Sequence, residues 1–350
     1  MSKTIGIGID IGSEIKFSCQ EKQIAIPNVI GSSDPIGFGE LTSDKSWENN
    51  LILFDEEEEF YIGELARTQS EIKQFILDQG NLEKIDEIFL IIKAILPLIA
   101  NKDETDIIVG IGVPISTSVK RMKELSAKIK GKFSIKIKNE ATNEIKEVEK
   151  TIKKAFIMPQ SYGSYYSIVS DLEEGVAIDS VVISLDLLTE ILTVYNGEII
   201  RTASLNLTNA SLFVLANKIS QALQQQTGHI INPHTILGNI RKNQDQVIIS
   251  GKNYDIGKVK EHYIRQIAND IVDNLSQVLN KLPLEAEVEY YIITGEAVEL
   301  FWTEIEMLIL EHNLIRDLDL DRIIKVENPI FSNSIGFEKL VQKQLEGSEG

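Results

Sequence analysis

The sequence is short of cysteine and of positive charge. Cys19 is the single cysteine in 350 residues, which excludes a disulfide within the chain and predicts a reducing, cytoplasmic environment. Acidic residues outnumber basic ones by 53 to 35, which gives a net charge of -18. Such a surplus disfavours direct contact with nucleic acid or with an anionic membrane surface.

Long apolar runs and metal-binding patterns are also missing. The longest apolar stretch, residues 89–100, is interrupted by Lys93 and Pro97, so no membrane-spanning helix is expected. A strand is predicted almost from the first residue, which indicates that there is no signal peptide. The histidines are scattered without the spacing of metal ligands. At roughly 150 residues per domain, the length favours two domains of a soluble globular protein.

The chain does contain a predicted β-hairpin at its beginning. An apolar run leads into Asp10, and Gly12-Ser13 precedes a second strand that carries Lys16. Glycine allows a phosphate to approach the backbone, and the Asp10 carboxylate can hold the Mg²⁺ that accompanies a phosphate. The alternative is an ordinary N-terminal hairpin whose Asp10 faces solvent.

Strand and helix patterns occur in the same order in both halves of the sequence. In the first half, strands are predicted at 23–27, 51–54, 59–62, 106–113, 132–138 and 147–158, and helices at 68–79, 81–97, from 116 or 117 to about 130, and from 159. In the second half, strands are predicted at 181–186, 189–195, 198–203, 289–293 and 323–326, and helices at 208–227, 234–241, 256–281, up to about 312, and at the C-terminus. Asp10 and Asp186 each end an apolar strand, which indicates a weak duplication in which two hairpins clamp one polyphosphate.

Several of these motifs resemble those of the actin-like ATPases and occur in the order found in that superfamily. The similar stretches are residues 10–16 (first phosphate loop), 109–114 (the strand before the first interdomain connection), 158–163 (the connecting helix), 186–189 (second phosphate loop), 292–297 (adenosine loop) and 333–337 (second connection). The chain therefore resembles the prokaryotic ParM-type and archaeal actin-like proteins over nearly its whole length.

The resemblance implies an α/β fold of two actin-like domains, each of the ribonuclease H-like type, with a nucleotide cleft between the domains. It assigns residues 1–164 and 326–350 to domain I, in which 31–75 form a small subdomain. It assigns residues 165–325 to domain II, in which about 208–285 form the small subdomain.

The resemblance also implies roles for individual residues. Asp10 and Asp186 would hold Mg²⁺ through water molecules, and Gln160 would orient the attacking water. The nucleotide, ATP or GTP, would be contacted by Gly12, Ser13, Lys16, Thr189, Lys218, Gly295 and Glu296. Each role has a structural alternative: Gln160 is also a plain helix start, Lys218 a solvated helix residue, and Glu296 a carboxylate favoured by a helix macrodipole.

Two loops depart from the superfamily pattern. The second phosphate loop usually reads Asp-x-Gly-x-x-Thr, whereas Asp186-Leu187-Leu188-Thr189 is interpreted as a shortened loop without glycine. Leucine at such a turn would crowd a phosphate and disfavours positive φ. The adenosine loop retains only Gly295, and the first hairpin is interpreted as one residue short. These departures leave nucleotide hydrolysis open, with a weak ATPase as the expected upper limit.

Three functions are compatible with this reading. The first is a nucleotide-binding protein that polymerises head-to-tail into cytoskeletal filaments, in which nucleotide state controls domain closure and assembly and an adaptor or cargo protein is a further partner. The second is a degenerate, non-hydrolysing binding or scaffolding protein. The third is a small-molecule kinase of the same superfold, although no sugar-binding signature is present. We take the first as the working hypothesis.

Overall fold

The computed structural model describes residues 4–33, 44–76, 82–171, 178–283, 285–315 and 320–347. The chain divides into unit 1, Met1–Glu173 with Asn333–Gly350, and unit 2, Glu174–Ser332. The domain boundary expected at 164 falls inside helix α4 (Ser161–Val169), and the boundary expected at 325 falls at the last residue of strand β18 (Ile323–Lys325).

Unit 1 is built on one mixed sheet. Its strands are β1 (Thr4–Ile11), β2 (Glu14–Cys19), β3 (Lys22–Pro27), β4 (Val29–Ser32), β5 (Leu51–Asp55), β6 (Glu58–Ile62), β7 (Lys73–Phe75), β8 (Asp106–Val113), β9 (Gly131–Asn139) and β10 (Ile145–Pro159). Their order is β3-β2-β1-β8-β10-β9-β5-β6-β4-β7. Strands β1, β8 and β10 are parallel, so their carboxyl ends lie at one edge of the sheet.

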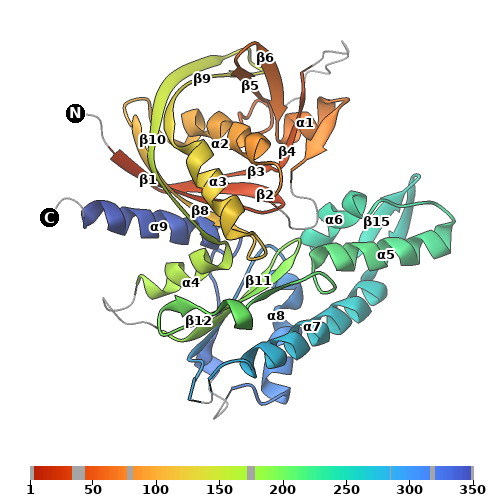
Figure 1. The fold of residues 1–350 in the computed structure, drawn as a ribbon. Helices are drawn as coiled ribbons and strands as arrows, with labels where there is room; N and C mark the ends of the chain where they lie inside the picture. Colours follow the sequence, from red (N-terminus) through yellow and green to blue (C-terminus); the bar gives the residue numbers. More distant parts are fainter. Residues whose placement is uncertain are drawn as a thin grey trace. The chain divides into compact units, whose positions relative to one another are not determined.

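The two faces of strand β1 differ because its residues alternate. Ile7 and Ile9 are fully buried in the apolar core of unit 1, which also contains Ile92 of helix α2 (Ile85–Ile99). On the other face, Gly6 and Gly8 lie against helix α9 (Ser332–Glu346), the dark blue helix next to the C-terminus in Figure 1. A Cβ atom on Gly8 would lie 1.8 Å from a backbone oxygen of this helix, so the close packing requires glycine.

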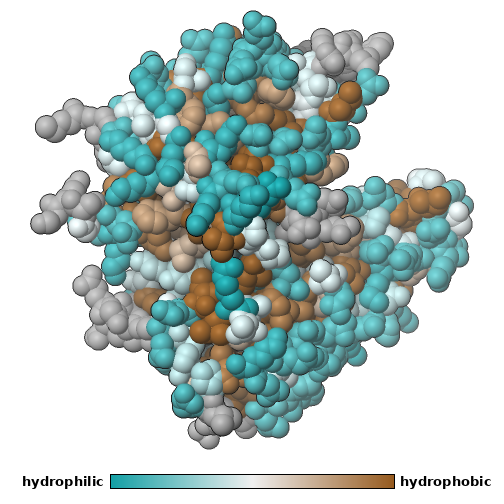
Figure 2. All heavy atoms as spheres, in the orientation of Figure 1, coloured by the Kyte–Doolittle hydropathy of each residue, from teal (hydrophilic) through white to brown (hydrophobic). Residues whose placement is uncertain are grey.

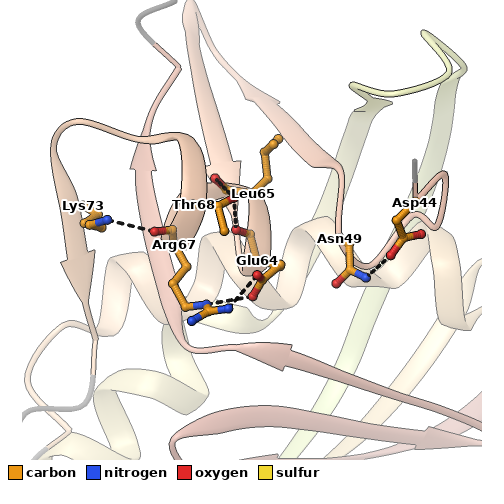
Figure 3. A network of polar contacts seen from close by, with 7 residues as sticks. All are labelled: Asp44, Asn49, Glu64, Leu65, Arg67, Thr68 and Lys73. Atoms are coloured by element: carbon orange, nitrogen blue, oxygen red, sulfur yellow. Dashed lines mark hydrogen bonds and ion pairs between the residues drawn. The ribbon is translucent and has the colours of Figure 1, made fainter. Parts of the chain in front are cut away.

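The outer part of unit 1 corrects one predicted helix. Helix α1 (Glu64–Gln69) ends at Gln69, so residues 70–76 of the predicted helix are not helical, and β7 pairs with β4. Residues 77–79 of the predicted helix lie outside the described residues. Figure 3 shows the contacts that hold this turn, where Arg67 binds both carboxylate oxygens of Glu64 and Lys73 donates to the Arg67 carbonyl.

A third helix of unit 1 starts slightly later than predicted. Helix α3 (Val119–Ile129) is capped by Ser118, whose side chain accepts a hydrogen bond from Arg121 N, rather than by residue 116 or 117.

Unit 2 contains a second sheet and a separate two-stranded ribbon, which together include three unpredicted strands. Its strands are β11 (Ser180–Leu185), β12 (Thr189–Tyr195), β13 (Glu198–Ile199), β14 (Leu205–Leu207), β17 (Tyr290–Thr294) and β18, and the order is β13-β12-β11-β17-β18 with β14 paired to β12. A separate ribbon joins β15 (Gln246–Ile249) and β16 (Lys252–Asp255). Of these strands, β14, β15 and β16 were not predicted.

The helices of unit 2 follow the predicted order. They are α5 (Leu212–Thr227), α6 (Pro233–Arg241), α7 (Gly257–Leu279) and α8 (Val298–Glu311). Their apolar faces share one core with the sheet, whereas hydrophilic side chains predominate on the visible surface of α5 and α7 (Figure 2). Among the described residues, no helix combines the length and apolarity needed to cross a membrane.

Candidate functional site: two hairpins with different chemistry

The β1–β2 hairpin of unit 1 places a buried carboxylate opposite a buried ammonium group. Asp10 is the next-to-last residue of β1 and pairs with Lys16 on β2 and with Gly112 on β8. Asp10 and Lys16 are only 2% and 3% exposed. Burying an ionisable side chain costs free energy unless an opposite charge or a hydrogen bond offsets the desolvation. Asp10 and Lys16 are therefore charged groups whose positions are fixed by their partners.

The turn of this hairpin is fixed from outside. Ile11 and Ile15 form the last pair, which leaves a three-residue connection that contains Gly12 and Ser13. Asn28 donates from Nδ2 to the Gly12 carbonyl at 2.9 Å and from its backbone N to the Ser13 carbonyl at 3.1 Å. The two carbonyls are therefore held by Asn28, and the Gly12 amide donates to the Glu14 carbonyl at 3.1 Å, so the turn is fixed by its own hydrogen bonds.

Helix α9 provides a residue that the sequence analysis did not assign to the site. Asn333 donates from Nδ2 to Oδ2 of Asp10 at 3.2 Å, while its Oδ1 accepts from Ser164 Oγ at 2.6 Å. Asn333 thus orients Asp10 through a hydrogen bond that spans 323 residues of sequence. The stretch 333–337 was identified only as a connection, and nothing local in it indicates contact with Asp10.

Gln160 lies at the same sheet edge as Asp10, between β10 and α4. Its backbone N donates to the Val113 carbonyl at 2.8 Å, and its side chain is 7% exposed. Among the described residues, its buried Oε1 has no hydrogen-bond partner. Desolvation raises the pKa of Tyr162, two residues further along the chain, above its ordinary value. A buried amide oxygen without a partner usually indicates a missing donor, such as water or a ligand.

The β11–β12 hairpin of unit 2 has the same register as the first hairpin but different residues. Leu185 and Thr189 form its last pair, which again leaves a three-residue connection. Ser184 therefore occupies the position of Asp10, and the buried Glu190 occupies that of Lys16. Asp10 comes one residue before the last pair of its hairpin, whereas Asp186 comes one residue after the last pair. The two aspartates that suggested a duplication are thus two positions apart in register.

This register corrects two interpretations of the loops. The second connection is not shortened relative to the first, since each joins its last pair through three residues. With Ser184 in the acid position of Asp-x-Gly-x-x-Thr, Thr189 falls on the threonine and Asp186 on the glycine of the pattern.

Asp186 is bonded within unit 2. Its Oδ2 accepts from Ser184 Oγ at 2.7 Å, and its Oδ1 accepts from the backbone N of Glu296 at 3.1 Å. The carbonyls of Asp186 and Leu187 also accept from the first two amides of helix α5, at 3.4 and 3.3 Å. The start of α5 and the hairpin turn are therefore tied together.

The predicted adenosine loop is held by unit 2 itself. Gly295 has φ of +100°, and a Cβ atom there would lie 2.6 Å from the backbone of Leu185, so packing within unit 2 already requires this glycine. The Glu296 carboxylate is paired with Arg241 at 3.0 Å. From the sequence, a helix macrodipole is the alternative explanation for Glu296. In the structure an ion pair with Arg241 of helix α6 holds this carboxylate.

Lys218 is engaged on helix α5, away from any helix end. Its ammonium group lies 5.2 Å from the ring centre of Tyr263 on α7, a cation–π contact. Both side chains are half-buried, so Lys218 is neither fully solvated nor withdrawn from the surface.

The fold and the sequence of unit 1 match known proteins. Residues 8–163 match the family model of the actin-like proteins N-terminal domain. Among solved structures, the archaeal actin homologue Ta0583 is 17% identical with a TM-score of 0.76, over 97% of this chain and 99% of that one. The chain has an actin-like fold. This confirms the predicted two-domain α/β fold of the actin-like type, and the family model adds a sequence resemblance to actin-like proteins over residues 8–163.

Two further structures of this fold show a ligand and an assembly. Ta0583 in complex with ADP is 17% identical with a TM-score of 0.72, over 97% of this chain and 99% of that one. A 15-stranded ParM filament from Clostridium botulinum is 19% identical with a TM-score of 0.73, over 97% and 99% of the two chains. No curated protein matches the sequence.

Proposed function

We propose that this actin-like chain binds ATP or GTP with Mg²⁺ and polymerises head-to-tail into cytoplasmic filaments whose assembly depends on the nucleotide. The actin-like fold supports this proposal, because the archaeal relative is described as a complex with ADP and the clostridial ParM as a filament. A heterologous contact between identical subunits does not close on itself and therefore builds filaments. An adaptor or cargo protein would be a further partner.

The observation that carries the proposal is the pairing of Asp10 with Lys16 at the end of β1. Lys16 would face phosphate oxygens, Gly12 would let a phosphate approach the backbone, and Ser13 would contribute its hydroxyl group. The Asp10 carboxylate fits Mg²⁺, a hard cation that prefers oxygen ligands and usually retains several waters. No group of three potential metal-ligating acids, histidines or cysteines occurs among the described residues, so Mg²⁺ would be held mainly by water and phosphate.

Gln160 would orient water beside the terminal phosphate. Its buried Oε1 lacks a donor in the described residues, and a bound water would supply one. A neutral amide orients water without removing a proton, which suits a weak hydrolase. Thr189, Lys218, Gly295 and Glu296 would contribute the contacts of unit 2 with the nucleotide.

One observation favours a second candidate, a scaffold that assembles without nucleotide. The first amides of α5 are bonded to the carbonyls of Asp186 and Leu187, and a helix start whose amides are bonded internally is less available to an anion. If these hydrogen bonds exclude nucleotide from unit 2, the chain would assemble whether or not nucleotide is present.

Equilibrium titration with a non-hydrolysable ATP analogue and Mg²⁺ tests the first function directly. We expect saturable binding by the natural chain and a loss of at least about tenfold for Asp10→Ala, because a charged contact is worth more than about 1.4 kcal/mol. Asp179→Ala is the control, since this acid lies at the opposite end of β11 and accepts a backbone hydrogen bond from Asn196. Equal affinity of the natural chain and Asp10→Ala would overturn the proposal.

A further inference from the structure

The hairpin of unit 2 contains an acid where a phosphate-binding turn has a glycine. The equal registers of the two hairpins place Asp186 level with Gly12, the glycine of the first turn. Asp186 is 9% exposed, so its carboxylate is nearly buried. A fixed negative charge at this position opposes an approaching phosphate, whereas a glycine would leave room for one.

The groups that bond this carboxylate are of the type that bond phosphate. Asp186 accepts one hydrogen bond from a hydroxyl group, Ser184 Oγ, and one from a backbone amide, Glu296 N. Hydroxyl and backbone N–H donors that converge on one oxyanion are the usual means of holding a phosphate group. Here they already hold an oxyanion that belongs to the chain.

The surrounding charges strengthen this effect. Glu190 is 1% exposed and stands opposite Ser184, whereas the equivalent position in unit 1 is Lys16. Arg241 is paired with Glu296, whose backbone N donates to Asp186. The position beside the turn thus carries opposite charges in the two hairpins, Lys16 in unit 1 and Glu190 in unit 2.

We propose that Asp186 acts as an internal anion that occupies the phosphate-binding position of unit 2 and weakens nucleotide binding. This inference rests on the proposed nucleotide function and replaces the expected role of Asp186 as a magnesium ligand. It makes nucleotide affinity depend mainly on the β1–β2 hairpin, and it identifies Asp186 as the residue that limits affinity.

The test compares Asp186→Asn with the natural full-length chain in titrations with a fluorescent, non-hydrolysable ATP analogue. Removing a like charge near a phosphate should raise affinity about fivefold or more. Asp186→Gly should do the same, and Ser184→Ala should not, because it removes a donor but keeps the charge. Asp179→Asn is the matched control, a carboxylate of the same unit that accepts a backbone hydrogen bond at 2.7 Å.

Magnesium separates the two roles of Asp186. An internal anion repels the free analogue more than its Mg²⁺ complex, so the gain for Asp186→Asn should be larger without Mg²⁺. If Asp186 were a magnesium ligand, Asp186→Asn would bind the Mg²⁺ complex more weakly and the difference would vanish without the metal. Weaker or unchanged binding by Asp186→Asn therefore overturns the inference.

The inference and the proposed function fail in different ways. Binding by the natural chain with no gain for Asp186→Asn or Asp186→Gly would overturn the inference alone. Binding only by the Asp186 variants would support the inference and overturn nucleotide-dependent assembly of the natural chain. Absence of binding by all chains, with unchanged thermal melting, would overturn both.

Discussion

Asn333 holds the Asp10 carboxylate from helix α9, with Nδ2 3.2 Å from Oδ2. The same amide group accepts a hydrogen bond from the buried hydroxyl of Ser164 through Oδ1. One side chain therefore joins the end of β1, helix α4 and helix α9 within unit 1. Because the carboxylate is buried, its orientation depends on such partners rather than on water.

Asn333→Ala tests whether this orientation matters for the site. Removing this buried amide takes a hydrogen bond from Asp10 and from Ser164, and we expect a loss of about 1–3 kcal/mol in unfolding free energy. We also expect weaker nucleotide binding, because the Asp10 carboxylate loses its fixed position. Chemical denaturation and nucleotide titration measure the two effects. Asn274→Ala is the control, since Asn274 donates to a carbonyl of its own helix, Asp270 O, and not to another element. Equal stability and affinity in Asn333→Ala and Asn274→Ala would contradict this role.

Gly8→Ala tests the packing of helix α9 on the sheet. A Cβ atom on Gly8 would lie 1.8 Å from Ser334 O and 2.5 Å from Glu338 N, both backbone atoms that cannot move independently of the helix. We expect a loss of at least about 3 kcal/mol in unfolding free energy from this overpacking. A Cβ atom on Gly238 in helix α6 would have no neighbouring atom within 4 Å, so Gly238→Ala should gain up to about 1 kcal/mol. A similar result for both variants in urea denaturation would refute the packing argument.

Ionisation of Tyr291 makes the free energy of unfolding depend on pH in the alkaline range. Burial raises the pKa of Tyr291 to about 12, and its hydroxyl donates to the Leu314 carbonyl at 2.7 Å. Because the folded pKa lies above the unfolded value of about 10, the stabilisation is complete below pH 10 and is lost as the pH rises to 12. Tyr291→Phe should remove this part of the decline, of the order of 2 kcal/mol. Parallel declines of both proteins between pH 10 and 12 would contradict it.

The sequence was sufficient for elements whose ends are marked by local chemistry. Apolar runs that stop at Asp10, Pro114 and Thr294 gave strands β1, β8 and β17, because buried parallel strands are apolar on both faces. The β15–β16 ribbon had a usable signal that was overlooked. Ser250 and Gly251 form its turn with positive φ values of 48° and 77°, and a Ser-Gly pair between short strands is typical of such turns.

The features that could not be predicted from the sequence depend on contacts between residues far apart in the chain. Residues 68–76 have helical spacing, but Lys73 pairs with Gly31 on β4, so tertiary contacts override the local preference. The apolar runs before Asp10 and Asp186 look alike, yet strand register places the two acids differently. Counting five positions back from Thr189 would have identified Ser184 as the equivalent of the superfamily acid. The contact between Asn333 and Asp10 has no local signal at all.

Nucleotide-dependent assembly is tested most directly by light scattering of the purified chain at several concentrations, with and without Mg-ATP or Mg-GTP. We predict a rise in scattering that requires nucleotide, starts above a critical concentration and disappears in Asp10→Ala. A rise that is equal without nucleotide, or that persists unchanged in Asp10→Ala, would contradict nucleotide-dependent assembly through the β1–β2 hairpin.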